Sequence, residues 1–178
     1  RERQAVEALA VEEGVAQAQL LLDQDENRAA IIVGSPDWHP GVVGLVAARL
    51  KERFQRPVFA MSWNGDGVGA GSGRSVPGVD LGRVVRSAVD LGLLIKGGGH
   101  AMAAGVTLAR GNLAAFAQKL DDDLRSGVAM MLANQELMVD AAIYYCETGK
   151  ESLCYVKQIR FRIPLTVQTG GGRDVRIL

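Results

Sequence analysis

The sequence predicts an α/β fold: a layered domain with a mixed β-sheet flanked by helices, preceded by a linker helix and followed by a partial small β unit. Strand-like and helix-like hydrophobic patterns alternate through the first 135 residues, which is typical of a sheet with helices packed on it. The turn signal Asn64-Gly65-Asp66-Gly67 joins two strand patterns, so at least one strand pair is expected to be antiparallel. After about Gln135 only short β-type pieces follow. We therefore expect a linker helix over 1–26, the layered domain over 27–135 and a β unit over 136–178.

The first elements follow from composition and spacing. Arg1 to about Asp23 is rich in Ala, Glu, Gln and Leu, which favours a helix. Four of its apolar residues recur at near-helical spacing, which also favours a helix: Val6, Leu9, Ala16 and Leu20. A short apolar strand is expected over Ala29 to Val33, and Pro40 can open the next helix at its first position.

The remaining elements of the layered domain follow in the same way. The predicted strands are Pro57 to Trp63, Val68 to Ser75 and Ala103 to Ala109. Asp80 is a candidate N-cap for a helix, and a further helix is expected from Leu113 onward. In the last segment, strands are expected over Leu137 to Tyr145 and Arg160 to Val167, before Gly170-Gly171-Gly172.

Composition limits the function classes. Of the 178 residues, 48% are apolar and 22% are charged, as in ordinary folded proteins, and no apolar run approaches the roughly 20 residues of a membrane span. The start, Arg1-Glu2-Arg3-Gln4, has no initiator Met and no signal-peptide pattern, so we expect a piece of a longer protein. Cys146 and Cys154 are too few for a disulfide framework or a zinc site. Free thiols in a reducing cytoplasm, with no membrane partner, are the expectation.

The net charge of the chain is zero, but the charge is unevenly distributed. Residues 31–110 hold nine basic and five acidic groups, a net charge of +4. That sign favours a polyphosphate ligand. The alternative interpretation is that the net charge of +4 is a chance excess of basic residues on a solvent-exposed face.

The first candidate site is the segment Gly71-Ser72-Gly73-Arg74-Ser75. Alternate glycines leave a strand nearly bare, so that a ligand backbone can approach closely. Ser72 and Ser75 offer hydroxyl groups, and Arg74 offers a planar fork suited to phosphate. A twisted, glycine-rich strand with a surface arginine is the structural alternative.

The second candidate site is Gly97-Gly98-Gly99-His100. Consecutive glycines can form an anion-holding nest of backbone N–H groups. His100 directly after it can donate to a phosphate oxygen or act as acid or base near neutral pH. The segment therefore favours phosphate binding, with His100 in a supporting catalytic role.

A third element starts at Trp38-His39-Pro40-Gly41, where free N–H groups at a helix start meet an aromatic ring and a histidine. Trp38 as a hydrophobic staple and His39 as a helix cap are the structural alternatives. No Walker loop is present, because no Lys-Ser or Lys-Thr follows a G-x-x-x-x-G run. Asp121-Asp122-Asp123 points around a predicted helix and is read as a solvated face, so no metal site is predicted in this chain.

Together these motifs resemble the RecJ family of single-stranded-DNA exonucleases in the DHH phosphoesterase superfamily. The resemblance rests on Trp38 to Leu50, Arg56-Pro57-Val58, Gly71 to Ser75 and Gly98 to Gly105, in this order and spacing. It covers about residues 1–140 and is to the DHH-associated C-terminal domain. The opening Arg1-Glu2-Arg3-Gln4 resembles the start of the helix that joins the two halves of the family's catalytic core.

The resemblance implies a parent enzyme that hydrolyses single-stranded DNA from its 5′ end in DNA repair and recombination. It implies Mn²⁺ or Mg²⁺ held by an N-terminal DHH domain of the same polypeptide, which this chain lacks, so the fragment alone is expected to be inactive. Single-stranded DNA is the implied partner. The residues implied to hold its phosphate backbone are Ser72, Gly73, Arg74, Ser75, Gly98, Gly99 and His100, with Trp38 and His39 beside them.

Two alternatives remain at this stage: a DHH phosphodiesterase for short oligonucleotides or cyclic dinucleotides, and a non-catalytic nucleic-acid-binding module such as the related tail domain of alanyl-tRNA synthetase. The family continues into an oligonucleotide-binding β barrel. Residues 159–164 do not supply the barrel's usual opening segment, so 136–178 is either the start of such a unit or a divergent tail. No function is assigned beyond Asp140.

Overall fold

The computed structural model describes residues 2–133, 136–146 and 154–164. Its contacts divide the chain into two units, Arg1–Ala129 and Met130–Leu178, and each is described by itself. The elements up to the boundary, the last of which runs past it, are α1 (Glu2–Gln24), β1 (Ile31–Ser35), α2 (Val43–Phe54), β2 (Val58–Trp63), β3 (Val68–Arg74), α3 (Leu81–Asp90), β4 (Lys96–His100), β5 (Ala103–Ala109), the 3-10 helix η1 (Arg110–Asn112) and α4 (Leu113–Ala133).

The five strands form one mixed sheet in the order β1-β2-β3-β5-β4. β1 and β2 are parallel, and every other pair is antiparallel. The β2–β3 hairpin turns at Asn64, whose side chain accepts the Val68 N–H at 2.8 Å, and this confirms the predicted hairpin and the mixed α/β fold. β4 was not expected as a strand, since its sequence is mostly glycine.

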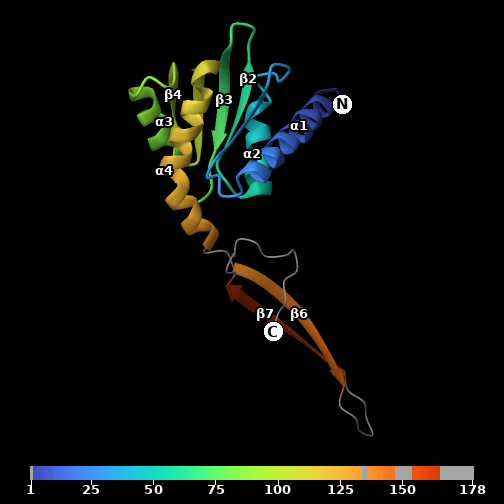
Figure 1. The fold of residues 1–178 in the computed structure, drawn as a ribbon. Coiled ribbons are helices and arrows are strands. Elements are labelled where there is room, and N and C mark those ends of the chain that lie inside the picture. The colour runs from blue at the N-terminus through green and yellow to red at the C-terminus, as the bar shows by residue number, and fades with distance from the viewer. Residues whose placement is uncertain (1, 134–135, 147–153, 165–178) are drawn as a thin grey trace. The chain divides into compact units, whose positions relative to one another are not determined.

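Helices lie on both sides of the sheet, with α1 and α2 on one face and α3 and α4 on the other (Figure 1). On the α2 side, Val46 and Leu50 pack with Ile31 and Val58 in one apolar cluster. On the other side, the rings of Phe59 on β2 and Phe116 on α4 meet edge to face, with centroids 5.4 Å apart. Each face of β2 therefore has its own core, which explains why all six of its residues are buried.

α1 is a helix as predicted, and the apolar residues whose spacing indicated it are mostly exposed. Val6, Leu9 and Leu20 are exposed by 48%, 67% and 64%. The fully buried residues of α1 are all small: Ala10, Gly14 and Ala18. A Cβ at Gly14 would lie 3.1 Å from Val46 Cγ1 on α2, so small residues are needed where the two helices approach closely.

The two helix starts differ in how well the sequence predicted them. α3 begins as predicted, because the Asp80 side chain accepts the Arg83 N–H at 3.0 Å. α2 begins at Val43 rather than at Pro40. The His39 carbonyl accepts the Val42 N–H in a tight turn at 2.9 Å, and this turn delays the helix by three residues.

β1 forms one edge of the sheet, and α1 covers part of that edge. The side-chain amide of Gln17 accepts the Gly34 N–H at 3.0 Å and donates to the Gly34 carbonyl at 3.3 Å. One glutamine side chain thus makes both hydrogen bonds that a neighbouring strand would make to Gly34.

The second unit contains an antiparallel pair, β6 (Glu136–Cys146) and β7 (Cys154–Pro164). The strand expected over Leu137 to Tyr145 is confirmed, while β7 begins earlier and ends earlier than the expected 160–167. The side chains of both cysteines and the whole of Gly170-Gly171-Gly172 lie outside the described part of the chain, so the expected free thiols are not addressed. The boundary at 135 and the identity of the β unit remain predictions.

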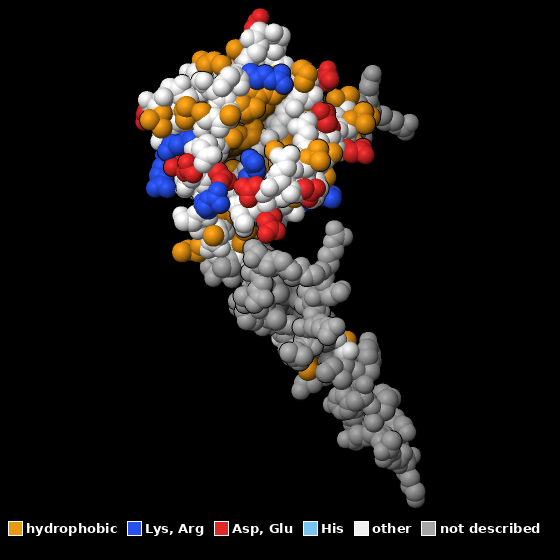
Figure 2. All heavy atoms as spheres, viewed as in Figure 1, with side chains coloured by type: hydrophobic (Ala, Val, Ile, Leu, Met, Phe, Trp, Pro, Cys, Tyr) orange, Lys and Arg blue, Asp and Glu red, His pale blue; other side chains and the backbone are white. Residues whose placement is uncertain are grey.

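Acidic and basic side chains lie interspersed on the face of the first unit seen in Figure 2, in keeping with the zero net charge. That face carries no broad field of one sign. Among the described residues, no helix is long and apolar enough to cross a membrane.

Candidate nucleic-acid interface

The alternate glycines of β3 fill a packing role on one face of the sheet. Each lies opposite a large β2 residue: Gly69 opposite Trp63, Gly71 opposite Met61 and Gly73 opposite Phe59. A Cβ added at any of these glycines would lie within 3 Å of the side chain opposite. We call the side of β3, β5 and β4 that α3 and α4 pack against the covered face. Its glycines give space to the protein's own side chains, rather than to a ligand.

We call the opposite side of the same three strands the open face. On this side α2 packs against β3, and no helix of the described chain covers β5 or β4. Strand pairing arranges the residues of the open face in three rows. The rows, each running from β3 through β5 to β4, are Arg74, Ala103 and His100; Ser72, Gly105 and Gly98; and Ala70, Thr107 and Lys96. The two predicted clusters thus lie on one surface, and Arg74 and His100 share a row about 10 Å across.

The N-terminus of α2 lies against the Arg74 end of this face. A Cβ at Gly44 would be 3.1 Å from Arg74 Nη2 and 3.5 Å from Ser72 Oγ. Val42 at the N-cap position makes no side-chain capping hydrogen bond. Arg74 Nη1 donates to Ser72 Oγ at 2.7 Å and to the Gly73 carbonyl at 2.8 Å, which fixes the guanidinium beside the helix start. A cation, a hydroxyl and a positive helix end therefore converge, the combination that binds phosphate.

His39 and Trp38 fill the structural roles that the sequence left open for them. His39 Nδ1 accepts the Gly41 N–H at 2.9 Å, so the ring caps the turn before α2. The Trp38 side chain is in the core, 4% exposed, and its Nε1 donates to Glu13 Oε2 at 2.7 Å. Trp38 is therefore not available for stacking on a base, whereas exposed His39 still borders the open face.

Ser75 also lies away from the open face. It is 1% exposed, and its hydroxyl donates to the Val79 carbonyl at 2.6 Å. Its backbone N–H donates to the Met102 carbonyl at 3.0 Å. Ser75 joins the end of β3 to the loops before α3 and β5, and its hydroxyl does not point to a ligand surface.

The Gly97-Gly98-Gly99-His100 segment is an extended edge strand rather than the expected nest. Gly97 and Gly99 face the covered side, where Gly99 has φ +154° and a Cβ would lie within 3 Å of Ala103 O. A Cβ at Gly98 would meet nothing within 4 Å. Of the three glycines, only Gly98 presents bare backbone to the open face, while His100 next to them is exposed.

Two hollows border the open face. One, of about 490 Å³, is lined by the loop before α2, including His39 and Pro40, and by Ala70 of β3. The other, of about 420 Å³, lies over β3, β5 and β4 and is lined by Lys96, Gly98, Gly105 and Thr107 among others. Both hollows are lined by residues of the Ala70 row, and neither is lined by a residue of the Arg74 row.

The sequence motifs did not include two residues of the open face, Thr107 on β5 and Lys96 at the start of β4. Period-2 spacing within each strand could have placed them on one face, but only the register between strands aligns them with Ser72 and Arg74. Gly44 and Gly105 belong to the stretches that carry the family resemblance, but neither was given a role there.

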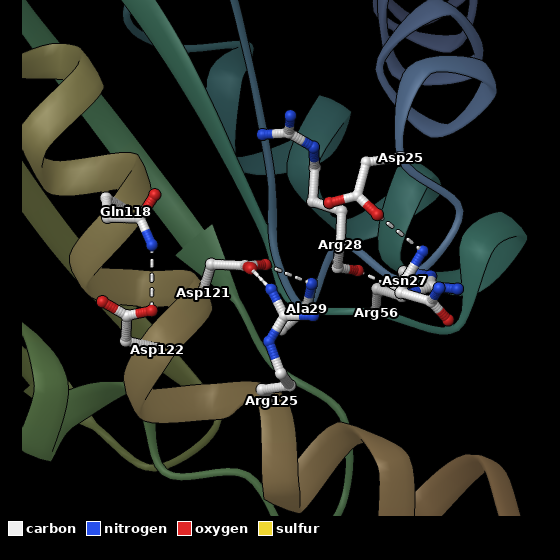
Figure 3. A network of polar contacts seen from close by, with 9 residues as sticks. All are labelled: Asp25, Asn27, Arg28, Ala29, Arg56, Gln118, Asp121, Asp122 and Arg125. Carbon is white, nitrogen blue, oxygen red and sulfur yellow. Dashed lines mark hydrogen bonds and ion pairs between the residues drawn. The ribbon is translucent and has the colours of Figure 1, made fainter.

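The first residue of the aspartate run on α4, Asp121, makes contacts within the protein instead of facing solvent alone (Figure 3). Asp121 Oδ1 accepts the Ala29 N–H at 2.5 Å, and Asp121 also pairs with Arg125. Asp122 accepts a hydrogen bond from the side chain of Gln118, and Asp123 forms an ion pair with Lys119; both partners are on the same helix. Asp121 therefore connects α4 to the start of β1.

Arg56 completes the same network from the start of β2. Its guanidinium donates to the Arg28 carbonyl and, at 2.7 Å, to the Glu26 carbonyl. Burial lowers the pKa of Arg56 from its usual value, and the carboxylates of Asp25, Asp121 and Glu26 oppose that shift. These contacts hold the α1–β1 loop in place and lie apart from the residues of the open face.

The described residues do not fit a divalent metal. Nowhere among them do three His, Cys, Asp or Glu side chains come together as a possible ligand set. The open face offers cations and hydroxyls, which are groups for an anion.

Comparison with known proteins identifies relatives of this domain. The model of the DHHA1 domain family matches residues 12–126. The single-stranded-DNA-specific exonuclease RecJ of Salmonella typhimurium is 36% identical over 149 residues, covering 79% of this chain and 26% of that protein. RecJ of Dickeya dadantii is 44% identical over 107 residues, covering 58% of this chain and 18% of that protein. The chain thus spans about a quarter or less of these relatives.

Two crystal structures of RecJ share the fold. RecJ in complex with Mg²⁺ from Thermus thermophilus matches with a TM-score of 0.58 and 22% identity, covering 95% of this chain and 31% of that one. An exonuclease RecJ bound to manganese matches with a TM-score of 0.50 and 33% identity, covering 70% of this chain and 32% of that one. The first likeness shows the fold alone; the second adds sequence similarity to it.

Proposed function

The chain belongs to the DHHA1 domain family, and we propose that it is the part of a RecJ-like, metal-dependent 5′-to-3′ single-stranded-DNA exonuclease that holds the DNA phosphate backbone. The open face is the proposed binding surface. The observation that carries the proposal is the convergence of Arg74 and Ser72 on the N-terminus of α2, beside Gly44. Charge-assisted hydrogen bonds from a guanidinium fork, with a helix end behind them, suit a phosphate group.

His100 lies in the same row as Arg74, two strand spacings away. In our proposal it supports the reaction from this side, by donating to a phosphate oxygen or by moving a proton at its ring. Both roles need the ring within hydrogen-bond reach of the phosphate. Gly73 and Gly99 act indirectly, since they let β3 and β4 pack closely and so fix the positions of Arg74 and His100.

The metal chemistry belongs to another part of the parent protein in this proposal. Mn²⁺ or Mg²⁺ held by an N-terminal DHH domain would supply the hydrolytic chemistry, and the 178-residue chain alone would be inactive. Exposed Val6, Leu9 and Leu20 on α1 offer apolar surface for such a domain of the same polypeptide. A nuclease that acts in DNA repair and recombination works where the chromosome is, so the proposal includes the bacterial cytoplasm.

Replacing Arg74 tests the proposal. Loss of a charge-assisted phosphate contact costs on the order of 1.5 to 3 kcal/mol, so Arg74→Ala is expected to weaken binding of a 5′-phosphorylated thymidine oligonucleotide about tenfold or more. Affinity is measured by fluorescence anisotropy with the 178-residue chain at one fixed salt concentration.

The matched control is Arg83→Ala, which removes one exposed arginine from α3, on the other side of the sheet. It is expected to leave the affinity unchanged. Equal affinities of Arg74→Ala and the unmodified chain would contradict the proposal. Equal losses in the two variants would also contradict it, because they would reflect overall charge alone.

A further inference from the structure

Lys96 is a basic residue on the open face to which neither the motifs nor the proposed phosphate site assigns a role. It is the first residue of β4 and is exposed. It forms no ion pair with any residue that the structure describes. Its neighbour Gly97 faces Val85 and Leu94 on the covered side, so the Lys96 side chain lies on the open face.

Strand register places Lys96 at the far end of the surface from Arg74. Lys96 pairs with Thr107, and Thr107 pairs with Ala70, two rows from the Arg74 row. Two rows correspond to four residues, about 13 Å along the strands, and two strand spacings add about 10 Å across them. The diagonal from Arg74 to Lys96 is therefore roughly 16 Å.

The diagonal between these two cations passes over strand positions that have no side chain. Gly105 is the middle of the intervening row and Gly98 is its β4 end, and a Cβ at either would meet nothing within 4 Å. The hollow of about 420 Å³ lies here, with Lys96 and Thr107 on its rim. A nucleic-acid backbone can thus approach the sheet in van der Waals contact between the two ends.

We propose that Lys96, with the Thr107 hydroxyl beside it, contacts a second phosphate of the same DNA strand. This inference rests on the proposed function, since Arg74 and Ser72 hold the first phosphate. A stacked strand rises about 3.4 Å per nucleotide and an extended one about twice as much, so roughly two to five nucleotides separate the two contacts. The strand crosses the open face diagonally, over Gly105 and Gly98.

The inference predicts that the two cations depend differently on DNA length. A dinucleotide reaches only the Arg74 site, whereas a strand of about 12 nucleotides, within the usual range of single-strand site sizes, reaches both. Arg74→Ala is expected to weaken binding of both lengths. Lys96→Ala is expected to weaken the longer strand about three- to tenfold and to leave the dinucleotide unchanged.

The experiment measures both lengths of 5′-phosphorylated oligothymidylate with the 178-residue chain, by competition against a labelled 12-nucleotide strand. Lys96→Arg is expected to retain the affinity, and Thr107→Val, which keeps the side-chain shape, is expected to lower it about twofold for the longer strand only. Arg83→Ala is the control for lost charge. For the longer strand, the slope of log affinity against log salt is expected to fall by about 0.7 in Lys96→Ala, the value for one phosphate contact.

The outcomes separate the inference from the proposed function. If Lys96→Ala leaves the longer strand unaffected, or weakens both lengths equally, the second contact is overturned while the Arg74 site stands. If the unmodified chain binds neither length, or if Arg74→Ala changes neither, the proposed function fails and the inference fails with it.

Discussion

The two faces of β3, β5 and β4 are both rich in glycine, and they use it for opposite purposes. On the covered face, Gly69, Gly71 and Gly73 leave space that Trp63, Met61 and Phe59 fill completely. On the open face, Gly98 and Gly105 leave space that no described residue fills. The comparison shows that a bare strand marks a ligand surface only where its missing side chains are not replaced from within the protein.

The same distinction between the two faces determines what the other residues of the Gly71–Ser75 motif contact. Ser72 and Arg74 alternate with the packing glycines and so point to the open face. Ser75, one residue past the strand, turns into the interior. A single five-residue motif therefore contains ligand-facing residues, packing residues and a loop anchor.

The largest expected effect is on the covered face. In Gly73→Ala the new methyl would lie 2.5 Å from Cε1 of Phe59, whose ring is held against Phe116. We expect a loss of about 3 kcal/mol in the free energy of unfolding, at the upper end of overpacking costs, measured by urea denaturation. Gly105→Ala is the matched control, with the same substitution on the open face, and is expected to unfold like the unmodified chain. Equal stability of the two variants would break the distinction between the faces.

A smaller effect on stability is expected at Ser75. Ser75→Ala removes the hydroxyl that donates to the buried turn at Val79, and leaving that carbonyl without its donor costs about 1 to 2 kcal/mol. DNA affinity, measured on the folded variant, is expected to stay the same. A loss of affinity with unchanged stability would place Ser75 among the ligand contacts instead.

The smallest effect is expected on the open face itself. Gly105→Ala adds one methyl group where a strand is proposed to lie close to the sheet, so we expect about threefold weaker binding of a long single strand, corresponding to roughly 0.7 kcal/mol. The measurement is the anisotropy titration used for Arg74→Ala. Tighter or unchanged binding would mean that the strand does not pass over Gly105.

Much of the fold could be predicted because it depends on local signals. The Asp80 cap, the turn at Asn64 and the period of α3 are each contained in a few consecutive residues. The buried face of α1 could not be predicted in this way. Close packing against α2 selects Ala10, Gly14 and Ala18 there, and larger apolar residues at a similar spacing lie outside.

The candidate site was predictable in its chemistry but not in its geometry. Ser72, Arg74 and His100 stand out by residue type, and the structure places all three on one face. The role of the glycines could not be decided from the sequence. Glycine at every second position of a strand is expected both where a ligand approaches the strand and where large side chains of the neighbouring strand fill the space. Lys96 was missed because its alignment with Thr107 and Ala70 depends on pairing between strands that are distant in the sequence.

The contact between Gln17 and Gly34 makes the two margins of the sheet unequal. At the β1 margin, a side-chain amide occupies the outward hydrogen-bonding groups of Gly34, so an incoming strand would have to displace it and part of α1. At the β4 margin, Arg86 Nη1 on α3 donates to the Gly99 carbonyl at 3.4 Å, but no side chain of the described residues makes both of the hydrogen bonds that a strand would make to one residue. An exchanged strand or an extended peptide is therefore expected to add to this sheet more readily at the glycine-rich margin than at the β1 margin.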